Sequence, residues 1–343
     1  MKRGTEMGRR LEGKVAVVTG SGMGAAKGIA VGLAREGARV VTNNRKPGSV
    51  GLSSWSNKET TESLLNEEDK KVIASLSGDA QTTADQIIAE GGEAIPFFGD
   101  PGHFDTAGQL IQTAVDQWGR IDILVNGASG SGFGPFLKIT QEDWHLQTHA
   151  KLTGTFNTMH HALPIMNQQR SGRILNAASD AWVGLPMLSA YSAANAGVVG
   201  LTRAVAQEVS GSNITCNVFC PRSISRNHVN WRASMRGKLA GGGPEIAALR
   251  ERLAKEEKDH QAPENLGPFL AYLATEEAGN INGTVFTVTA GGRIALYSGF
   301  TQVAEIQKND APWTVEELIV AVPERLLAGR ETTAGSASGA SPL

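Results

Sequence analysis

Short apolar runs alternate with longer amphipathic stretches along most of the chain. The short runs are rich in β-branched residues, which favour strands, and apolar residues three and four positions apart favour helices between them. The predicted strands are Val15–Thr19, Arg39–Thr42, Ala94–Phe98, Ile121–Asn126, Arg173–Ala177, Ile214–Phe219 and Thr284–Val288. The predicted helices are Gly24–Glu36, Thr82–Glu90, Thr106–Trp118, Gln141–Asn167 and Ala190–Val209. This alternation predicts an α/β fold, a Rossmann-type doubly wound parallel sheet of about seven strands with helices on both faces.

Two segments depart from this alternation and set the predicted domain organisation. An insertion at 47–78 follows the second strand; its first half is rich in Ser, Gly and Asn, and Lys58–Leu76 has helical spacing. Near the end, Trp313–Ala328 is predicted to be a further helix, which we expect to pack on a partner subunit. The tail is rich in Gly, Ala and Ser, a composition typical of disorder. The prediction is a single domain at 10–300, a C-terminal extension at 301–330 and a disordered tail at 331–343.

Composition narrows the classes of partner. A formal net charge of −2 over 343 residues gives no indication of nucleic-acid or membrane-surface binding. No apolar run approaches the roughly 20 residues of a membrane span, and no apolar segment of a signal peptide follows the basic start Met1–Arg10. We therefore expect a cytoplasmic protein with no nucleic-acid or membrane partner. The two cysteines, Cys216 and Cys220, lie in a predicted buried strand and are interpreted as core residues.

A glycine-rich turn joins the first strand to the first helix. Gly20, Gly22 and Gly24 stand where glycines let the backbone approach a pyrophosphate at a helix N-terminus, although such a turn also occurs as a plain connector. The second strand ends without an acidic residue that would bind the free ribose 2′-hydroxyl of NAD. Arg45 and Lys46 follow instead. Because a guanidinium suits a 2′-phosphate, NADP is favoured and NAD is the alternative.

Several motifs occur in an order and spacing that resemble the short-chain dehydrogenases over about residues 11–292. They are Thr19-Gly20-x-x-x-Gly24, Asp100, Asn126-Gly127-Ala128-Ser129, Ser179, Tyr191 and Pro221. The resemblance implies that Asp100 lies near the adenine and that Asn126, Gly127 and Ala128 support the cofactor. It also implies that Pro221 and Ser225 lie beside the nicotinamide carboxamide.

Relatives of this kind use Asn, Ser, Tyr and Lys together for catalysis. The resemblance implies that Tyr191 is the general acid or base and that Ser179 holds the substrate oxygen, if one residue is missing between them; Ala178 is the match without that deletion. Asn195 stands at the expected lysine position and Lys151 at the expected asparagine position. We hypothesise that Lys151 supplies the positive charge that Tyr191 needs, while Asn195 holds the ribose or a water.

These residues predict an NADP-dependent oxidoreductase that interconverts a carbonyl and a secondary alcohol. Arg222 to Lys238 carries five basic residues and no acidic ones, which favours an anionic substrate such as a carboxylate or a coenzyme A thioester. A solvated lid is the alternative interpretation of that segment. Gly291 to Ile294 resembles reductases related to the dehydrogenase part of peroxisomal multifunctional proteins, which handle acyl thioesters.

Two alternatives stay open: a catalytically silent subunit of a hetero-oligomer, and a lyase or hydratase on the same scaffold. The resemblance also implies a homodimer or homotetramer that packs through the helices at 141–167 and 190–209. No metal site is predicted, because His145 and His149 are four residues apart on one helix but have no third ligand nearby in the sequence.

Overall fold

A computed structural model describes residues 9–48, 52–55, 64–236, 239, 244–298, 302–308 and 312–329. Its main sheet has eight strands in the order β10-β9-β8-β7-β5-β1-β2-β4. Seven of them run parallel: β1 (Val15–Thr19), β2 (Arg39–Asn44), β4 (Ala94–Phe98), β5 (Ile123–Asn126), β7 (Gly172–Ala177), β8 (Ile214–Arg222) and β9 (Val285–Thr289). The Rossmann-type parallel sheet is therefore confirmed. The prediction missed β10 (Ile294–Leu296), a three-residue antiparallel edge strand too short to give a pattern.

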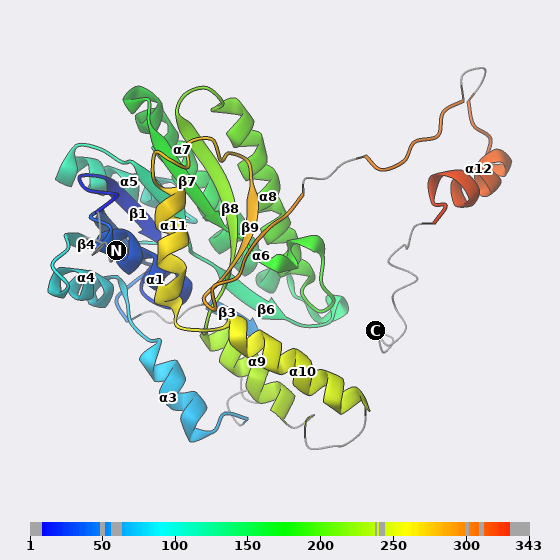
Figure 1. Cartoon of the computed structure of the whole chain (residues 1–343), viewed down its shortest axis with the longest axis horizontal. Helices are drawn as coiled ribbons and strands as arrows, with labels where there is room; N and C mark the ends of the chain where they lie inside the picture. Colours follow the sequence, from blue (N-terminus) through cyan, green and yellow to red (C-terminus); the bar gives the residue numbers. More distant parts are fainter. Residues whose placement is uncertain are drawn as a thin grey trace, which may run out of the picture. The chain divides into compact units, whose positions relative to one another are not determined.

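Helices cover both faces of the sheet (Figure 1). On one side, α1 (Gly24–Arg35) packs against α11 (Gly267–Leu273), and α4 (Ala80–Ala89) joins the same buried cluster. There a Cβ added at Gly32 would lie 2.5 Å from the Cα of Gly267, so only glycines allow this approach of the two helices. On the other side, α5 (Phe104–Trp118), α7 (Gly154–Gln169) and α8 (Ser189–Glu208) cover a second cluster. Cys216 and Cys220 are free and buried in the core, as expected.

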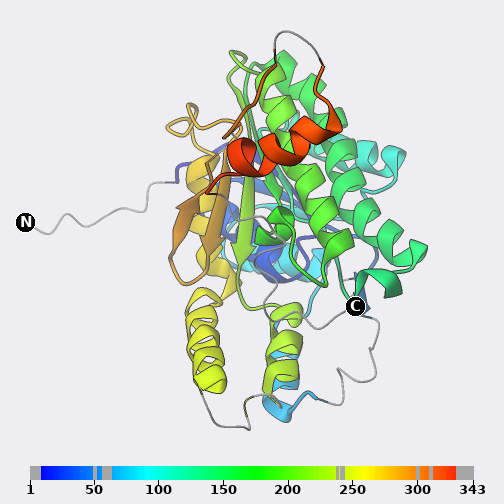
Figure 2. The same ribbon diagram turned by 90° about the vertical axis from the view of Figure 1, so that its right-hand side faces the viewer.

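Three helices stand at the edge where the parallel strands end. In Figures 1 and 2, α3 (Glu67–Ser75), α9 (Arg226–Arg236) and α10 (Pro244–Asp259) project from this edge. The helix α3 belongs to the predicted insertion and begins at a capping box formed by Asn66 and Asp69. Residues 58–63 of the predicted helix lie outside the described residues. The remaining strands, β3 (Leu52–Trp55) and β6 (Gly130–Phe133), form a separate two-stranded parallel sheet.

The long helix predicted at Gln141–Asn167 is interrupted. The structure has α6 (Gln141–Thr148), a π-helical turn at His149–Thr153 and then α7. A π-turn adds a residue to the i to i+4 pattern and changes the direction of the side chains on either side, so the predicted helix is present but is not regular throughout. Such turns are frequent at functional sites, and this one contains Lys151.

The chain divides into two compact units, residues 1–297 and 298–343. In the second unit, Thr314 caps α12 (Val315–Ala321), and a π-helical turn follows at Val322–Leu326. The expected helix at Trp313–Ala328 is thus present, with its α-helical part shorter than expected. The predicted tail at 331–343 lies outside the described residues, and the division into domains near residue 300 stays a proposal. Among the described helices, none is long and apolar enough to cross a membrane.

Candidate nucleotide-binding and active site

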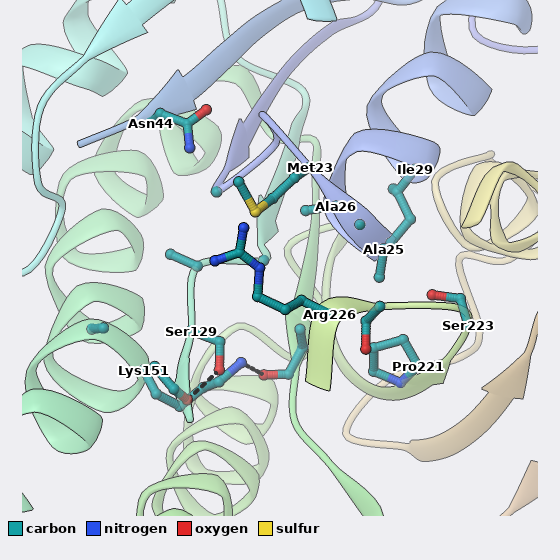
Figure 3. Close-up of a pocket in the computed structure, with 18 of the residues that line it drawn as sticks. Met23, Ala25, Ala26, Ile29, Asn44, Ser129, Lys151, Pro221, Ser223 and Arg226 are labelled. Carbon is teal, nitrogen blue, oxygen red and sulfur yellow. Dashed lines mark hydrogen bonds between the residues drawn. The ribbon is translucent and has the colours of Figure 1, made fainter. Parts of the chain in front are cut away.

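A cavity of about 320 Å³ opens at the carboxyl edge of the sheet (Figure 3). The cavity is lined by residues of the glycine-rich turn, the end of β2, the insertion, the π-turn, and the loops that follow β7 and β8. Of the predicted site residues, those that line it are Gly20, Gly24, Arg45, Asp100, Gly127, Ala128, Lys151, Tyr191, Pro221 and Ser225. The topology thus brings together at one edge most of the residues that the sequence singled out.

The glycine-rich turn fits a nucleotide phosphate. Gly20 and Gly24 have φ angles of 68° and 59°, in the left-handed region that favours glycine. A Cβ at Gly24 would meet no atom within 4 Å, so this position faces open space. No side chain caps the N-terminus of α1, which leaves its first N–H groups for a ligand. Gly22 does not line the cavity; a Cβ there would collide with the side chain of Asn44.

The end of β2 and the insertion form the wall expected to face the adenosine. Asn43, Asn44 and Arg45 line it, and the buried side-chain oxygen of Asn44 has no hydrogen-bond partner. Ile73, Leu76 and Ser77, at the end of α3, line the same cavity. The insertion therefore contributes part of the wall of this pocket.

In the motif Asn126-Gly127-Ala128-Ser129 at the end of β5, the glycine and alanine line the pocket, whereas the asparagine is buried in the core. The backbone N–H groups of Gly127 and Ala128 donate to the Thr19 hydroxyl at 3.0 and 3.1 Å, which ties β5 to the glycine-rich turn. Asn126 is buried, and its side chain bonds Asn176 and Thr158 at 2.8 and 2.6 Å. Asn126 was expected to support the cofactor, but it does not line the cavity. Its side-chain amide is hydrogen-bonded to buried residues of the core instead.

Tyr191 stands half-buried on the first turn of α8 and lines the cavity. Burial raises the pKa of its phenol, while the side chains of Ser179, Asn195 and Ser129 act in the opposite direction. The Ser179 side chain is hydrogen-bonded to Tyr191, whereas Ala178 has no hydroxyl; of the two, Ala178 lines the cavity and Ser179 does not. The Ser179 oxygen accepts a hydrogen bond from the Ala181 N–H at 3.2 Å, so its own proton remains available for donation.

Lys151 lies in the π-turn with only 2% of its surface exposed. Its ammonium donates to the carbonyl oxygen of Ala177 at 2.9 Å (Figure 3), and burial lowers its pKa to about 8. The side chain thus lines the cavity, as the hypothesis requires. However, its hydrogen bond goes to the backbone near Ser179 and not to the phenol of Tyr191.

Asn195 is fully buried one turn after Tyr191. Its amide nitrogen donates to the Tyr191 carbonyl oxygen at 2.7 Å, and its side-chain oxygen has no partner. An unpaired buried acceptor is costly unless water or a ligand completes it. Asn195 does not line the cavity directly, so its expected hold on a ribose would require an intervening water.

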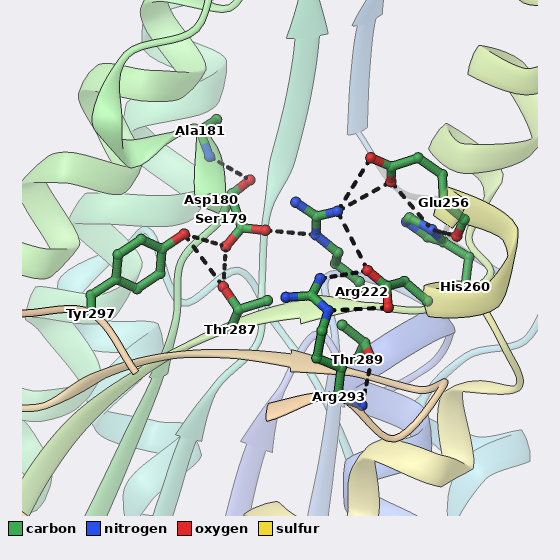
Figure 4. A network of polar contacts seen from close by, with 11 residues as sticks. Ser179, Asp180, Ala181, Arg222, Glu256, His260, Thr287, Thr289, Arg293 and Tyr297 are labelled. Carbon is green, nitrogen blue, oxygen red and sulfur yellow. Dashed lines mark hydrogen bonds and ion pairs between the residues drawn. The ribbon is translucent and has the colours of Figure 1, made fainter. Parts of the chain in front are cut away.

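The basic segment from Arg222 onward is largely neutralised by distant acids. Asp180, Glu256 and Asp259 surround Arg222 at 2.6 to 3.7 Å, in a network that continues to Arg293 and Tyr297 (Figure 4). Arg232 and Arg236 both bind the buried carboxylate of Asp69 on α3, at 3.0 and 2.7 Å. Arg222, Arg232 and Arg236 are thus paired with acids, whereas Arg226 lines the cavity, so the expected anionic substrate stays a prediction. Lys238 lies outside the described residues.

Among the lining residues that were not predicted as site residues, Ser223, Arg226 and His260 are polar and lie on the side formed after β8. Arg226 was noted only as part of the basic run. Nothing in the sequence pattern marks His260, which lines the cavity and whose ring stacks on that of His228 at 3.9 Å.

With this geometry established, comparisons with known proteins decide the family. A family model described as short chain dehydrogenase matches residues 51–235. The chain belongs to the short chain dehydrogenase family. It is thus an oxidoreductase of the dehydrogenase/reductase type, in a family that uses NAD(P).

Similar proteins cover nearly the whole first unit. The chain is 29% identical to the (2S)-[(R)-hydroxy(phenyl)methyl]succinyl-CoA dehydrogenase subunit BbsD of Thauera aromatica, over 84% of this chain and 99% of that protein. It is 30% identical to the 3-oxoacyl-[acyl-carrier-protein] reductase FabG of Thermotoga maritima, over 82% and 98%. A short chain dehydrogenase structure from Mycobacterium avium superposes with a TM-score of 0.70 at 29% identity, over 92% and 95%.

Proposed function

We propose that this short chain dehydrogenase is an NADP-dependent reductase that converts a ketone group on the acyl chain of an acyl thioester to a secondary alcohol. The observation that carries the proposal is the meeting of Tyr191, the glycine-rich turn and Arg45 in one cavity. The named activities of two similar proteins, on a coenzyme A thioester and on an acyl-carrier-protein thioester, support the substrate class.

The chemistry assigns one role to each residue. A bound nicotinamide would supply the hydride that adds to the carbonyl carbon. The Tyr191 phenol gives its proton to the carbonyl oxygen as the alcohol forms, and Ser179 donates a hydrogen bond to the same oxygen. Burial raises the pKa of Tyr191, which is consistent with a phenol that carries the proton this reduction needs.

Lys151 acts through the backbone in this proposal. Its ammonium holds the carbonyl oxygen of Ala177, two residues before Ser179, and so fixes the start of the loop that carries the serine. Asn195 holds a water on its unpaired oxygen and thereby returns a proton to Tyr191.

The cofactor preference is tested at the end of β2. We expect purified protein to bind NADPH more tightly than NADH, followed by nicotinamide fluorescence. Arg45→Ala should weaken NADPH binding about tenfold or more, because hydrogen bonds to charged groups contribute about 1.5–3 kcal/mol, and should leave NADH binding unchanged.

Lys46→Ala is the matched control, since Lys46 follows Arg45 and does not line the cavity. Equal losses of affinity in the two variants would contradict a specific role of Arg45. Binding of neither nucleotide by the wild type would overturn the proposed function.

A catalytically silent subunit is the second candidate. The raised pKa of Tyr191 and the bond from Lys151 to a backbone carbonyl favour it, because neither activates a phenolate directly. Nucleotide binding without turnover of any acyl thioester, together with co-purification with an active relative, would support this candidate over the reductase.

Assembly and location are also proposals. We propose a homodimer or homotetramer that packs through α6, α7 and α8, supported by the exposed Trp144 on α6 and Phe156 on α7. We propose that the protein works in the cytoplasm.

A further inference from the structure

Two histidines and an aspartate come together beside the nucleotide pocket. Asp100 follows β4, His103 precedes α5, and His149 lies in the π-turn. One potential ligand atom from each of the three lies within 4.8 Å of the others. His149 lies almost 50 positions after Asp100 and His103 in the sequence, so no short spacing pattern could reveal the group.

The geometry of the pair Asp100 and His149 is close to that of a metal site. The Oδ2 atom of Asp100 lies 3.5 Å from Nε2 of His149. Two ligand atoms of a tetrahedral zinc ion stand about 3.3 Å apart, given bond lengths of roughly 2.0–2.1 Å. His103 closes the group from the solvent side; its ring meets that of His149 edge to face at 5.0 Å. Because His103 is exposed, its ring can turn to complete the set.

The surrounding structure holds the ligands in place. The Gly102 N–H donates to Oδ1 of Asp100 at 2.8 Å, which orients the carboxylate and leaves Oδ2 toward His149. The buried side chain of Asn157 donates to the carbonyl oxygens of Pro101 and Gly102, both at 3.0 Å. The ring of His149 packs on Gly102 so closely that any side chain at that position would overlap it. Supporting hydrogen bonds of this kind are typical of metal ligands.

We propose that Asp100, His103 and His149 bind a divalent transition-metal ion of the zinc class at the rim of the nucleotide pocket. Two imidazoles and one carboxylate suit zinc and its neighbours better than magnesium or calcium, which take oxygen ligands. Three protein ligands leave at least one coordination position for water. The sequence predicted no metal site, because His145 and His149 had no third ligand nearby in the sequence; in the structure His149 meets Asp100 and His103, and His145 is not part of this group.

The site would also affect the nucleotide pocket, because Asp100 lines that pocket. A carboxylate oxygen bound to a metal ion is no longer free to accept a hydrogen bond from the adenine end of a nucleotide. This consequence rests on the proposed nucleotide site, whereas metal binding itself does not. We expect zinc to weaken NADPH binding to the wild type and to leave NADPH binding to a variant without the metal site unchanged.

The test is a titration of the chelator-treated full-length protein with zinc chloride, followed by calorimetry and by metal analysis after dialysis. We expect one zinc per chain in the wild type. His103→Asn should weaken zinc binding at least about tenfold, since even the loss of a residue supporting a ligand costs 10- to 100-fold. The exposed His103 does not line the nucleotide pocket, so this variant should fold and bind NADPH normally.

His145→Asn is the matched control, because His145 is equally exposed and lies one turn before His149. It should bind zinc as the wild type does. Absence of stoichiometric zinc from the wild type, or equal affinity in His103→Asn and the wild type, would overturn the site. Unchanged NADPH affinity in the presence of zinc would overturn the sharing of Asp100, while the metal count decides the site independently of nucleotide binding.

Discussion

At the scale of single residues, the main feature is that a lysine and an asparagine of the expected catalytic set have exchanged positions. In this chain the lysine is Lys151, buried in a π-turn, and the asparagine is Asn195, one turn after the catalytic candidate Tyr191. A buried ammonium with one hydrogen bond, to a backbone carbonyl, is costly, and its lowered pKa of about 8 reflects that cost. The charge is therefore present at neutral pH and is lost in mildly alkaline solution.

This titration predicts an alkaline limb in the pH–rate profile. As pH rises through about 8, Lys151 loses its proton and with it the charge that orients the Ser179 loop. We expect kcat/KM of the wild type to fall above that pH. Lys151→Met should be at least about tenfold less active at neutral pH, because it loses a buried charge-assisted hydrogen bond. Its pH–rate profile should also lack the alkaline limb.

The exposed lysine of the neighbouring loop, Lys138, gives the control Lys138→Met. That variant should keep the wild-type profile. An unchanged alkaline limb in Lys151→Met would show that another group titrates and would remove Lys151 from the mechanism.

At the scale of elements, the insertion and the helix after β8 form one unit over the pocket. Asp69 on α3 is almost fully buried and binds Arg232 and Arg236 of α9. Burial alone would raise the pKa of Asp69, but the hydrogen bonds from Arg236, the Asn66 backbone and Arg232 lower it overall. The ion pairs are thus fully formed above the ordinary pKa of an aspartate and are lost only as pH falls through the lowered value.

Asp69→Asn should release α3 from α9 and open the pocket wall that Ile73 and Leu76 form. We expect nucleotide binding to weaken roughly fivefold, equivalent to about 1 kcal/mol, with a smaller effect on kcat. Fluorescence titration with NADPH measures this.

Glu67→Gln is the comparison, because Glu67 is exposed on the same helix and pairs with the surface residue Lys70 at 2.8 Å. Wild-type affinity in Asp69→Asn would mean that the pocket wall does not depend on these ion pairs.

For the whole molecule, the main hydrophobic clusters lie within the first unit. Their buried members extend from Leu11 to Ala290. The network around Asp180 also ends inside this unit, at Tyr297, whose hydroxyl donates to Asp180 at 2.9 Å. The first unit therefore contains the core, the pocket and the proposed catalytic residues.

A chain truncated after Tyr297 should keep its fold. We expect its thermal midpoint to lie within about 3 °C of the full-length value, which corresponds to roughly 1 kcal/mol, and its NADPH affinity to be unchanged. Circular dichroism at matched concentrations measures the midpoint, with truncation after Gly329 as the control. Loss of cooperative unfolding would show that the second unit is part of the same folding domain.

The strand–helix alternation, the parallel sheet and the order of the glycine-rich turn, Ser179 and Tyr191 could all be predicted from the sequence. These features depend on local periodicity and on residues near one another in the chain. The sequence also indicated that Lys151 and Asn195 had exchanged positions. By contrast, one continuous helix at 141–167 was a reasonable prediction from periodicity, because a π-turn leaves little trace in the pattern of apolar positions.

What the tertiary structure alone decided are the contacts between distant segments. Arg222, Arg232 and Arg236 of the basic run pair with acids that lie outside the run, namely Asp69, Asp180, Glu256 and Asp259. Asn126 faces the core, and the candidate metal ligands Asp100, His103 and His149 meet only where the π-turn approaches the end of β4. The physical reason is that hydrophobic periodicity specifies which face of an element is buried, whereas charge pairing and ligand geometry depend on which elements become neighbours.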